Sequence, residues 1–166
     1  TKKTKWLIMN SPTNPSGALY SLSELLELTV ILNQFPHVNI ITDDIYEHIV
    51  YDKKRFYNIL NADMELKRRT LVVNGVSKSY AMTGWRLGYG AGEKSLISAM
   101  KIIQSQSTSN ASSISQHAAL EALDGPQDII LKNKILFEKR RNLVLSILRE
   151  APDLVWVKPE GAFYML

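Results

Sequence analysis

Short apolar runs alternate with longer helical segments along this chain, and this alternation constrains its fold more than any other feature. The runs of strand length are Trp6–Met9, Val38–Thr42, Thr70–Val73 and Arg86–Ala91. The segments with helical periodicity are 22–34, 94–105, 114–123 and 128–149. Buried strands separated by helices are typical of βαβ units. The sequence therefore predicts an α/β fold with a largely parallel sheet.

Several boundaries carry clear signals. Ser21 and Glu24 have the spacing of a capping box, and Gly125 with Pro126 is a helix stop. In the helix expected over 128–149, apolar residues fall on one face with Lys and Arg opposite; they are Leu136, Leu143, Val144, Ile147 and Leu148. A new strand is expected to start at Leu154–Val157. We expect a domain boundary at about residue 150, which divides the chain into parts 1–150 and 151–166.

Polar residues follow three of the expected strands. They lie in the segments 10–14, 43–46 and 74–78, and Arg86 comes eight positions after Lys78. In open α/β sheets, ligands bind outside the carboxyl ends of the strands. An amide, a carboxylate, a phenol and an amine at this edge suit an anionic, aromatic ligand that bears a carbonyl group. The glycines of 86–91 suggest close backbone approach.

Composition excludes several classes of site. Cys is absent, so disulfides, thiolate metal sites and Cys nucleophiles are excluded, which fits a cytoplasmic location. The three His residues lack metal-ligand spacing, and we expect no metal. The net charge of +4 is spread out, and no apolar run could cross a bilayer. We therefore expect neither a nucleic-acid partner nor a membrane.

Four segments of the chain resemble, in order, motifs of the class I aminotransferases, enzymes that depend on pyridoxal 5'-phosphate. The segment Ser77–Tyr89 resembles the family's cofactor-lysine motif, and Asn10–Gly17 and Asp43–Tyr46 resemble two others. Pro159–Tyr164 resembles the family's entry into its small domain. Short motifs match by chance, but four in order are specific. The resemblance implies the fold of type I pyridoxal-phosphate enzymes, with 1–150 in the cofactor-binding large domain and 151–166 beginning the small one.

The resemblance implies that Lys78 bonds covalently to the cofactor and is the catalytic residue. A neutral amine is needed for this chemistry. Asp43 would pair with the protonated ring nitrogen, so that the ring can accept electrons. Asp44 is the alternative carboxylate, and we prefer Asp43 because it directly follows the strand.

The other implied contacts surround the same ring. Tyr46 and Asn14 would donate hydrogen bonds to the cofactor's phenolate oxygen, and Asn14 is expected at the substrate as well. Arg86 would hold the phosphate with its guanidinium fork, and Ser77 would add a hydroxyl contact. Gly75 stands where some family members carry a phosphate-binding serine.

The implied function is transfer of an amino group between an amino acid and a 2-oxo acid. The segments 74–82 and 104–110 look most like the bacterial aspartate aminotransferase branch, which favours aspartate and 2-oxoglutarate. The alternatives are a carbon–sulfur lyase of the same fold, an aminotransferase-like domain of a transcription regulator, and a nucleotide-binding α/β module. The chain starts without Met and ends in an apolar run resembling a cut strand. We expect a part of a longer homodimeric protein, inactive by itself.

Overall fold

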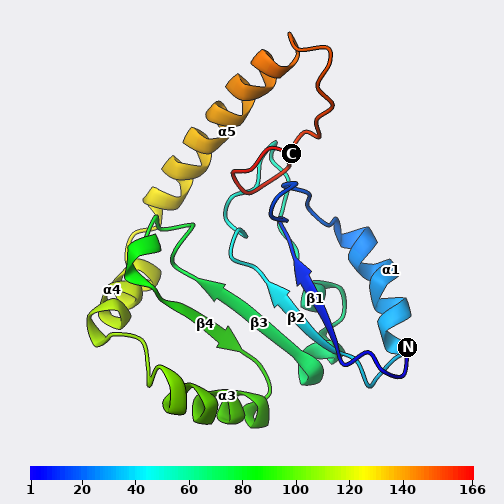
Figure 1. The fold of residues 1–166 in the computed structure, drawn as a ribbon, viewed down its shortest axis with the longest axis vertical. Coiled ribbons are helices and arrows are strands. Elements are labelled where there is room, and N and C mark those ends of the chain that lie inside the picture. The colour runs from blue at the N-terminus through cyan, green and yellow to red at the C-terminus, as the bar shows by residue number, and fades with distance from the viewer.

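The computed structural model describes residues 1–166, and its centre is a four-stranded sheet in the order β1-β2-β3-β4. The strands are β1 (Trp6–Asn10), β2 (Asn39–Asp43), β3 (Thr70–Gly75) and β4 (Gly88–Ala91). The first three are parallel, and β4 pairs with β3 in the antiparallel direction at one edge (Figure 1). The prediction of an α/β fold with a largely parallel sheet is confirmed.

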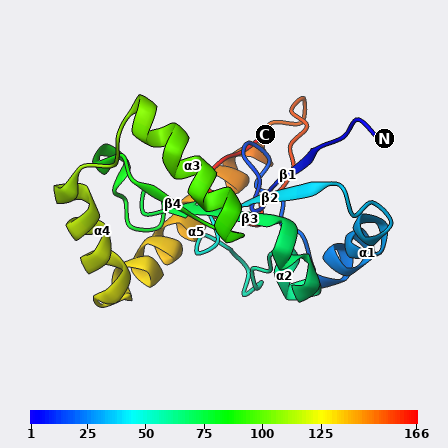
Figure 2. The ribbon, with the colours of Figure 1, turned by 90° about the horizontal axis from the view of Figure 1, so that it is seen from below.

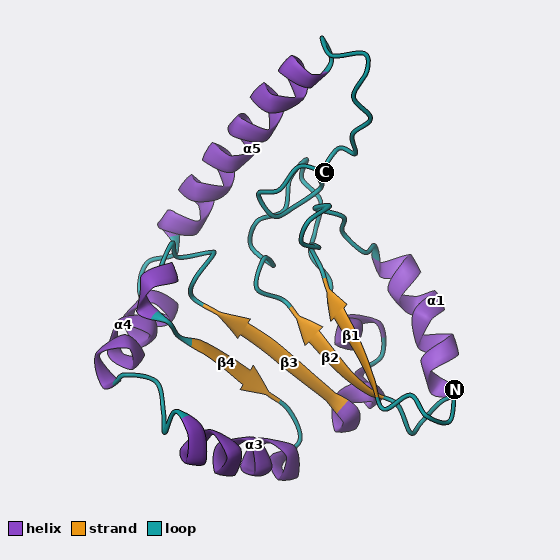
Figure 3. Ribbon diagram, viewed as in Figure 1, coloured by secondary structure: helices purple, strands orange, loops and turns teal.

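Five α-helices and two short 3-10 helices accompany the sheet. They are α1 (Leu22–Asn33), α2 (Ile59–Ala62), η1 (Met64–Arg69), η2 (Thr83–Trp85), α3 (Lys94–Ser107), α4 (Ser113–Asp124) and α5 (Asp128–Leu148). The four long helices match the expected segments to within two residues. Loops and turns make up the rest of the chain (Figure 3). No helix combines the length and the apolar character needed to cross a membrane.

The main core lies between α1, α2, η1 and the first two strands. Its buried side chains are Met9, Leu25, Leu32, Ile40, Ile59 and Leu66. In Figure 2, α1 and α2 lie together on one side of the sheet. The predicted capping box at the start of α1 is present, because Ser21 Oγ accepts from Glu24 N and Glu24 Oε2 accepts from Ser21 N at 2.8 Å. This cap fixes where α1 begins.

The fourth expected strand differs from its prediction in extent and environment. It begins at Gly88 rather than Arg86, and all four residues of β4 are exposed rather than buried. Arg86 adopts a left-handed conformation with φ of 53°, which is incompatible with a strand. The close approach expected of its glycines is confirmed, since a Cβ on Gly88 would lie 3.0 Å from the Asn74 carbonyl oxygen.

The C-terminal part also departs from the sequence prediction. No strand forms over 154–157, and Val157 N makes only one hydrogen bond, of 3.1 Å, to the Leu166 carbonyl. The run that ends the chain contributes a single bridge between Gly161 and Val50. Strand formation requires a neighbour to pair with, and Val155 is 98% exposed. The prediction of a regular strand here is wrong for this structure.

Helix α5 buries a different set of side chains from the one that its periodicity predicts. Leu143 and Ile147, on the predicted apolar face, are exposed. Leu145 is buried, and Arg141, expected on the solvated face, is only 5% exposed. The reason is tertiary: α5 extends past the carboxyl edge of the sheet, and the segment after it returns to that edge (Figure 1). Arg141 is buried where these parts meet.

Candidate functional site

The carboxyl ends of the three parallel strands bring the predicted polar segments to one edge of the sheet. Asn10 at the end of β1 is in register with Asp43 at the end of β2, and Asp43 is in register with Val73 of β3. Asn10 Nδ2 donates to the Asp43 carbonyl at 3.1 Å, while Asn10 Oδ1 accepts from Asn14 N at 2.9 Å. Asn10 therefore links the loop carrying Asn14 to the end of β2.

Tyr46 lies at the centre of this edge. Its side chain is buried, and its hydroxyl lies 2.6 Å from the hydroxyl of Tyr164. Burial, followed by the hydrogen bond with Tyr164, raises the pKa of Tyr46 far above its usual value. The nearby Asn14 side chain acts in the opposite direction and lowers that pKa. The structure thus brings Asn14, Tyr46 and Tyr164 together as one polar group.

The two neighbouring aspartates have different environments because side chains alternate along a strand. Asp44 is buried, and its carboxylate accepts from Thr42 Oγ1 at 2.5 Å and from Asn58 Nδ2 at 2.9 Å. Burial raises the pKa of Asp44 despite these bonds. Asp43 is partly exposed, and its carboxylate accepts only from the backbone N–H of Ile45, at 3.2 Å. Asp43 retains acceptor capacity for a ligand, whereas Asp44 is engaged within the fold.

Lys78 lies in the turn that follows β3 and is partly buried. Its Nζ lies 5.7 Å from the centre of the Phe163 ring, within the range of a cation–π contact. The Phe163 ring in turn meets Tyr46 edge to face, with 5.6 Å between centroids. Phe163 therefore connects the predicted catalytic amine to the predicted cofactor-binding phenol.

Ser77 and Lys78 also line a cavity of about 350 Å³. Thr83, Phe163 and residues of α5 complete its wall. Arg86 does not line this cavity: its side chain is exposed and donates to the Thr83 carbonyl oxygen at 2.8 Å. The Thr83 carbonyl thus links Arg86 to the wall of the cavity that Lys78 lines.

Phe163 and Tyr164 are site residues whose side-chain positions the sequence did not indicate. The segment around them is held at the sheet edge by the Gly17 carbonyl, which accepts from Glu160 N and Gly161 N at 2.9 Å each. Gly17 has φ of +68°, and a Cβ there would lie 2.4 Å from Pro159 Cβ. The resemblance of 159–164 to a family motif was the available signal, but it did not specify these contacts.

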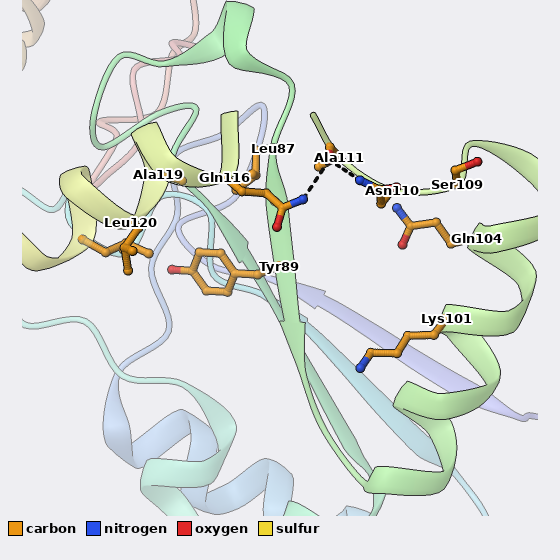
Figure 4. Close-up of a pocket in the computed structure, with 12 residues that line it drawn as sticks. Leu87, Tyr89, Lys101, Gln104, Ser109, Asn110, Ala111, Gln116, Ala119 and Leu120 are labelled. Atoms are coloured by element: carbon orange, nitrogen blue, oxygen red, sulfur yellow. Dashed lines mark hydrogen bonds between the residues drawn. The ribbon is translucent and has the colours of Figure 1, made fainter. Parts of the chain in front are cut away.

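A larger cavity, of about 620 Å³, lies elsewhere, between β4, α3 and α4. Figure 4 shows the side chains that line it, among them Tyr89 and Lys101. Two of its polar side chains, Asn110 and Gln116, donate to the Ala111 carbonyl oxygen at 2.7 and 2.8 Å. None of the predicted site residues lines it. The candidate site is therefore the carboxyl edge of the sheet rather than this larger cavity.

Comparison with known proteins agrees with this geometry. The family model for class I and II aminotransferases matches residues 1–166. The probable aspartate/prephenate aminotransferase of Rickettsia felis is 57% identical over 99% of this chain and 40% of its own length. The aspartate aminotransferase of Rhizobium meliloti is 51% identical over 99% of this chain and 40% of its own length. The chain thus spans about two fifths of the length of the curated relatives that it matches.

Solved structures show the same relationship in three dimensions. The crystal structure of the Rhizobium meliloti aspartate aminotransferase has a TM-score of 0.96 at 51% identity, over 99% of this chain and 41% of that one. The Thermus thermophilus aspartate aminotransferase with maleate has a TM-score of 0.89 at 38% identity, over 99% of this chain and 42% of that one. The fold, the order of the motifs and the matches over nearly the whole chain lead to one conclusion. The chain belongs to the class I and II aminotransferase family.

Proposed function

We propose that the full-length protein transfers an amino group from an amino acid, aspartate in the first place, to a 2-oxo acid such as 2-oxoglutarate. The observation that carries this proposal is the convergence of Lys78, Tyr46, Asn14 and Asp43 at one edge of the sheet of an aminotransferase-family chain. Relatives at 51–57% identity bear the names aspartate aminotransferase and aspartate/prephenate aminotransferase. These names favour aspartate as donor and add prephenate as an acceptor to be tested.

The donor and acceptor groups at this edge fit pyridoxal 5'-phosphate as the cofactor. Asp43 has acceptor capacity for a protonated ring nitrogen, since its carboxylate has only one backbone partner. The Tyr46 phenol and the Asn14 amide suit the ring oxygen, and Ser77 with Arg86 supplies a hydroxyl and a guanidinium for the phosphate. When bound, the cofactor supplies an electron sink for the bond that breaks at the substrate's Cα.

The protein's own groups have separate tasks in this proposal. Lys78 Nζ would hold the cofactor covalently, and as a free amine the same nitrogen would take the Cα proton as general base and return it as acid. Asp43 would keep the ring nitrogen protonated by placing a carboxylate beside it. Asn14 and Tyr46 orient the ring through their hydrogen bonds. The Phe163 ring lies beside the lysine amine, with 5.7 Å between Lys78 Nζ and the ring centre.

The remaining expectations about the whole protein belong to this proposal. Residues 1–150 form part of the cofactor-binding large domain, and 151–166 begin the small domain. The protein acts as a homodimer in the cytoplasm. The family resemblance supports the dimer, and the lack of cysteine is consistent with the compartment.

Reductive trapping tests the assignment of Lys78. Borohydride treatment of the full-length protein loaded with pyridoxal phosphate should leave an irreversible adduct on the peptide that contains Lys78. Lys78→Ala should abolish the adduct, and the control Lys94→Ala, at the exposed start of α3, should retain it. An adduct that persists on another lysine in Lys78→Ala would refute the assignment.

Steady-state assays test the type of reaction. Transfer of the amino group from aspartate to 2-oxoglutarate should exceed release of pyruvate from a thioether amino acid. The reverse order would favour the carbon–sulfur lyase.

A further inference from the structure

Arg141 of α5 is the most deeply buried cation of the chain and plays no part in the proposed chemistry. Its guanidinium forms a bidentate ion pair with Asp52, in which NH1 donates to Oδ2 at 2.8 Å and NH2 donates to Oδ1 at 2.7 Å. NH1 also donates to the Pro159 carbonyl at 3.0 Å, and the guanidinium carbon lies 4.7 Å from the centre of the Tyr51 ring. A buried arginine with this many directed contacts fixes the segments that it joins.

The segments joined in this way are α5, the turn after Tyr51 and the segment 158–163 that leads to Tyr164. Lys158 Nζ reaches the same Asp52 carboxylate at 2.9 Å from the solvent side. Asp52 N donates to Glu138 of α5 at 2.8 Å, and the Tyr51 hydroxyl donates to the Ala162 carbonyl. Ala162 N donates to the Ile49 carbonyl at 2.9 Å. Every bond of this set involves a residue two to six positions before Tyr164 or the turn that these residues contact.

Tyr164 is the point where this network meets the candidate site. Its hydroxyl lies 2.6 Å from that of Tyr46, and the two rings meet edge to face at 5.7 Å. The Tyr164 ring also packs against Phe163, at 4.8 Å between centroids, and Phe163 faces Lys78. A shift of the backbone at 159–162 would therefore move both aromatic side chains relative to Tyr46 and Lys78.

We propose that Arg141 is a positioning residue, which through Asp52 and the Pro159 carbonyl holds the Tyr164 phenol in a hydrogen bond with Tyr46. This inference rests on the proposed function, because it concerns the cofactor contact assigned to Tyr46. Either hydroxyl can donate across the 2.6 Å contact; when the Tyr46 hydrogen goes to the cofactor's ring oxygen, Tyr164 becomes the donor to the Tyr46 oxygen. Hydrogen bonds in such a chain polarise one another and strengthen each donation.

The expected consequence concerns the pH midpoint of the cofactor's absorption change. A hydrogen bond donated to a negatively charged oxygen favours the state that has lost its proton. Loss of the hydrogen bond donated by Tyr164 should therefore move the midpoint to higher pH. The expected shift is about half a unit to one unit, because a typical hydrogen bond contributes about 1 kcal/mol and one pKa unit corresponds to about 1.4 kcal/mol. Two other groups face the Tyr46 phenol, namely the Asp43 carboxyl group and the Asn14 amide. Both stay unchanged in the variants below.

The test uses the full-length protein loaded with pyridoxal phosphate and titrated in a spectrophotometer. Arg141→Gln and Tyr164→Phe should raise the midpoint by similar amounts, and the double variant should shift it no further than either single one. Arg141→Lys keeps the charge but lacks the guanidinium fork, and it should raise the midpoint by a smaller amount. This variant replaces Arg141→Gln in the test if Arg141→Gln does not fold. The control Lys158→Gln removes the half-exposed partner of the same carboxylate and should leave the midpoint in place.

Two results would overturn the positioning role. The first is that Tyr164→Phe and an Arg141 variant both keep the wild-type midpoint, although the free energy of unfolding of the Arg141 variant has fallen. Arg141 would then contribute to stability alone. The other is a double variant whose shift is the sum of the single shifts, because Arg141 would then act independently of Tyr164. Failure of the proposed function has a different signature, namely wild-type protein that shows no cofactor band or traps cofactor on another lysine.

Discussion

Replacing each of the adjacent aspartates by alanine should separate catalysis from stability. Asp44→Ala removes a buried carboxylate that accepts from Thr42 Oγ1 and Asn58 Nδ2. Each buried donor left without a partner costs about 1–3 kcal/mol, although the Thr42 hydroxyl can rotate towards another acceptor. Because burial also raises the pKa of Asp44, part of this loss is offset by relief of a buried charge. We expect a net destabilisation of about 2 kcal/mol.

Asp43→Ala should show the opposite pattern. Its carboxylate is partly exposed and makes one bond of 3.2 Å to a backbone N–H, so the free energy of unfolding should fall by at most about 1 kcal/mol. If Asp43 pairs with the cofactor's ring nitrogen, its loss acts on the transition state. A loss of about 4 kcal/mol there corresponds to a roughly thousandfold lower turnover.

The two quantities are measured separately on the full-length protein. Urea denaturation gives the free energy of unfolding, and initial rates with aspartate and 2-oxoglutarate give kcat. Asp43→Asn and Asp44→Asn serve as isosteric controls. Equal losses of kcat in Asp43→Ala and Asp44→Ala, at equal stability, would refute the assignment of the ring carboxylate to Asp43.

Four further predictions concern other parts of the chain. Gly161→Ala should destabilise the protein by about 1–3 kcal/mol in urea denaturation, because the added Cβ would lie 2.5 Å from Pro12 Cγ; unchanged stability would contradict this packing. Ser21→Ala should cost about 1 kcal/mol through loss of the α1 cap, measured in the same way. The Arg141 guanidinium holds the pKa of Asp52 well below its usual range. The stability that this ion pair contributes is therefore complete above the ordinary aspartate pKa of about 4 and is lost as the pH falls towards the depressed value. In acid, the free energy of unfolding should fall less steeply with pH in Asp52→Asn than in wild type. Residues 1–166 span about two fifths of the length of their relatives and should not by themselves transaminate aspartate with 2-oxoglutarate, because positioning of the substrate is a large part of catalysis. Turnover comparable to that of the full-length protein would contradict this expectation.

The sequence by itself determined the four long helices, the three parallel strands and the edge at which the candidate site lies. Local signals were sufficient for this, because a capping box at Ser21 and a helix stop at Gly125 act within a few residues of themselves. The convergence of Asn10, Asp43 and the lysine loop followed from the rule that parallel strands share a carboxyl edge. Roles for Lys78 and its neighbours came from the family resemblance and remain predictions.

Only the tertiary structure decided which side chains fill the site and which are buried around it. The periodicity of α5 placed Arg141 on a solvated face, whereas the structure buries it against Asp52, a residue 89 positions away in the sequence. In the same way, the contact between Tyr46 and Tyr164 joins residues 118 positions apart. The expected strand at 154–157 did not form, because strand formation depends on a partner and not on apolar composition alone. Periodicity records how a segment's own side chains are arranged, while burial, ion pairing and strand pairing depend on what the rest of the chain places beside it.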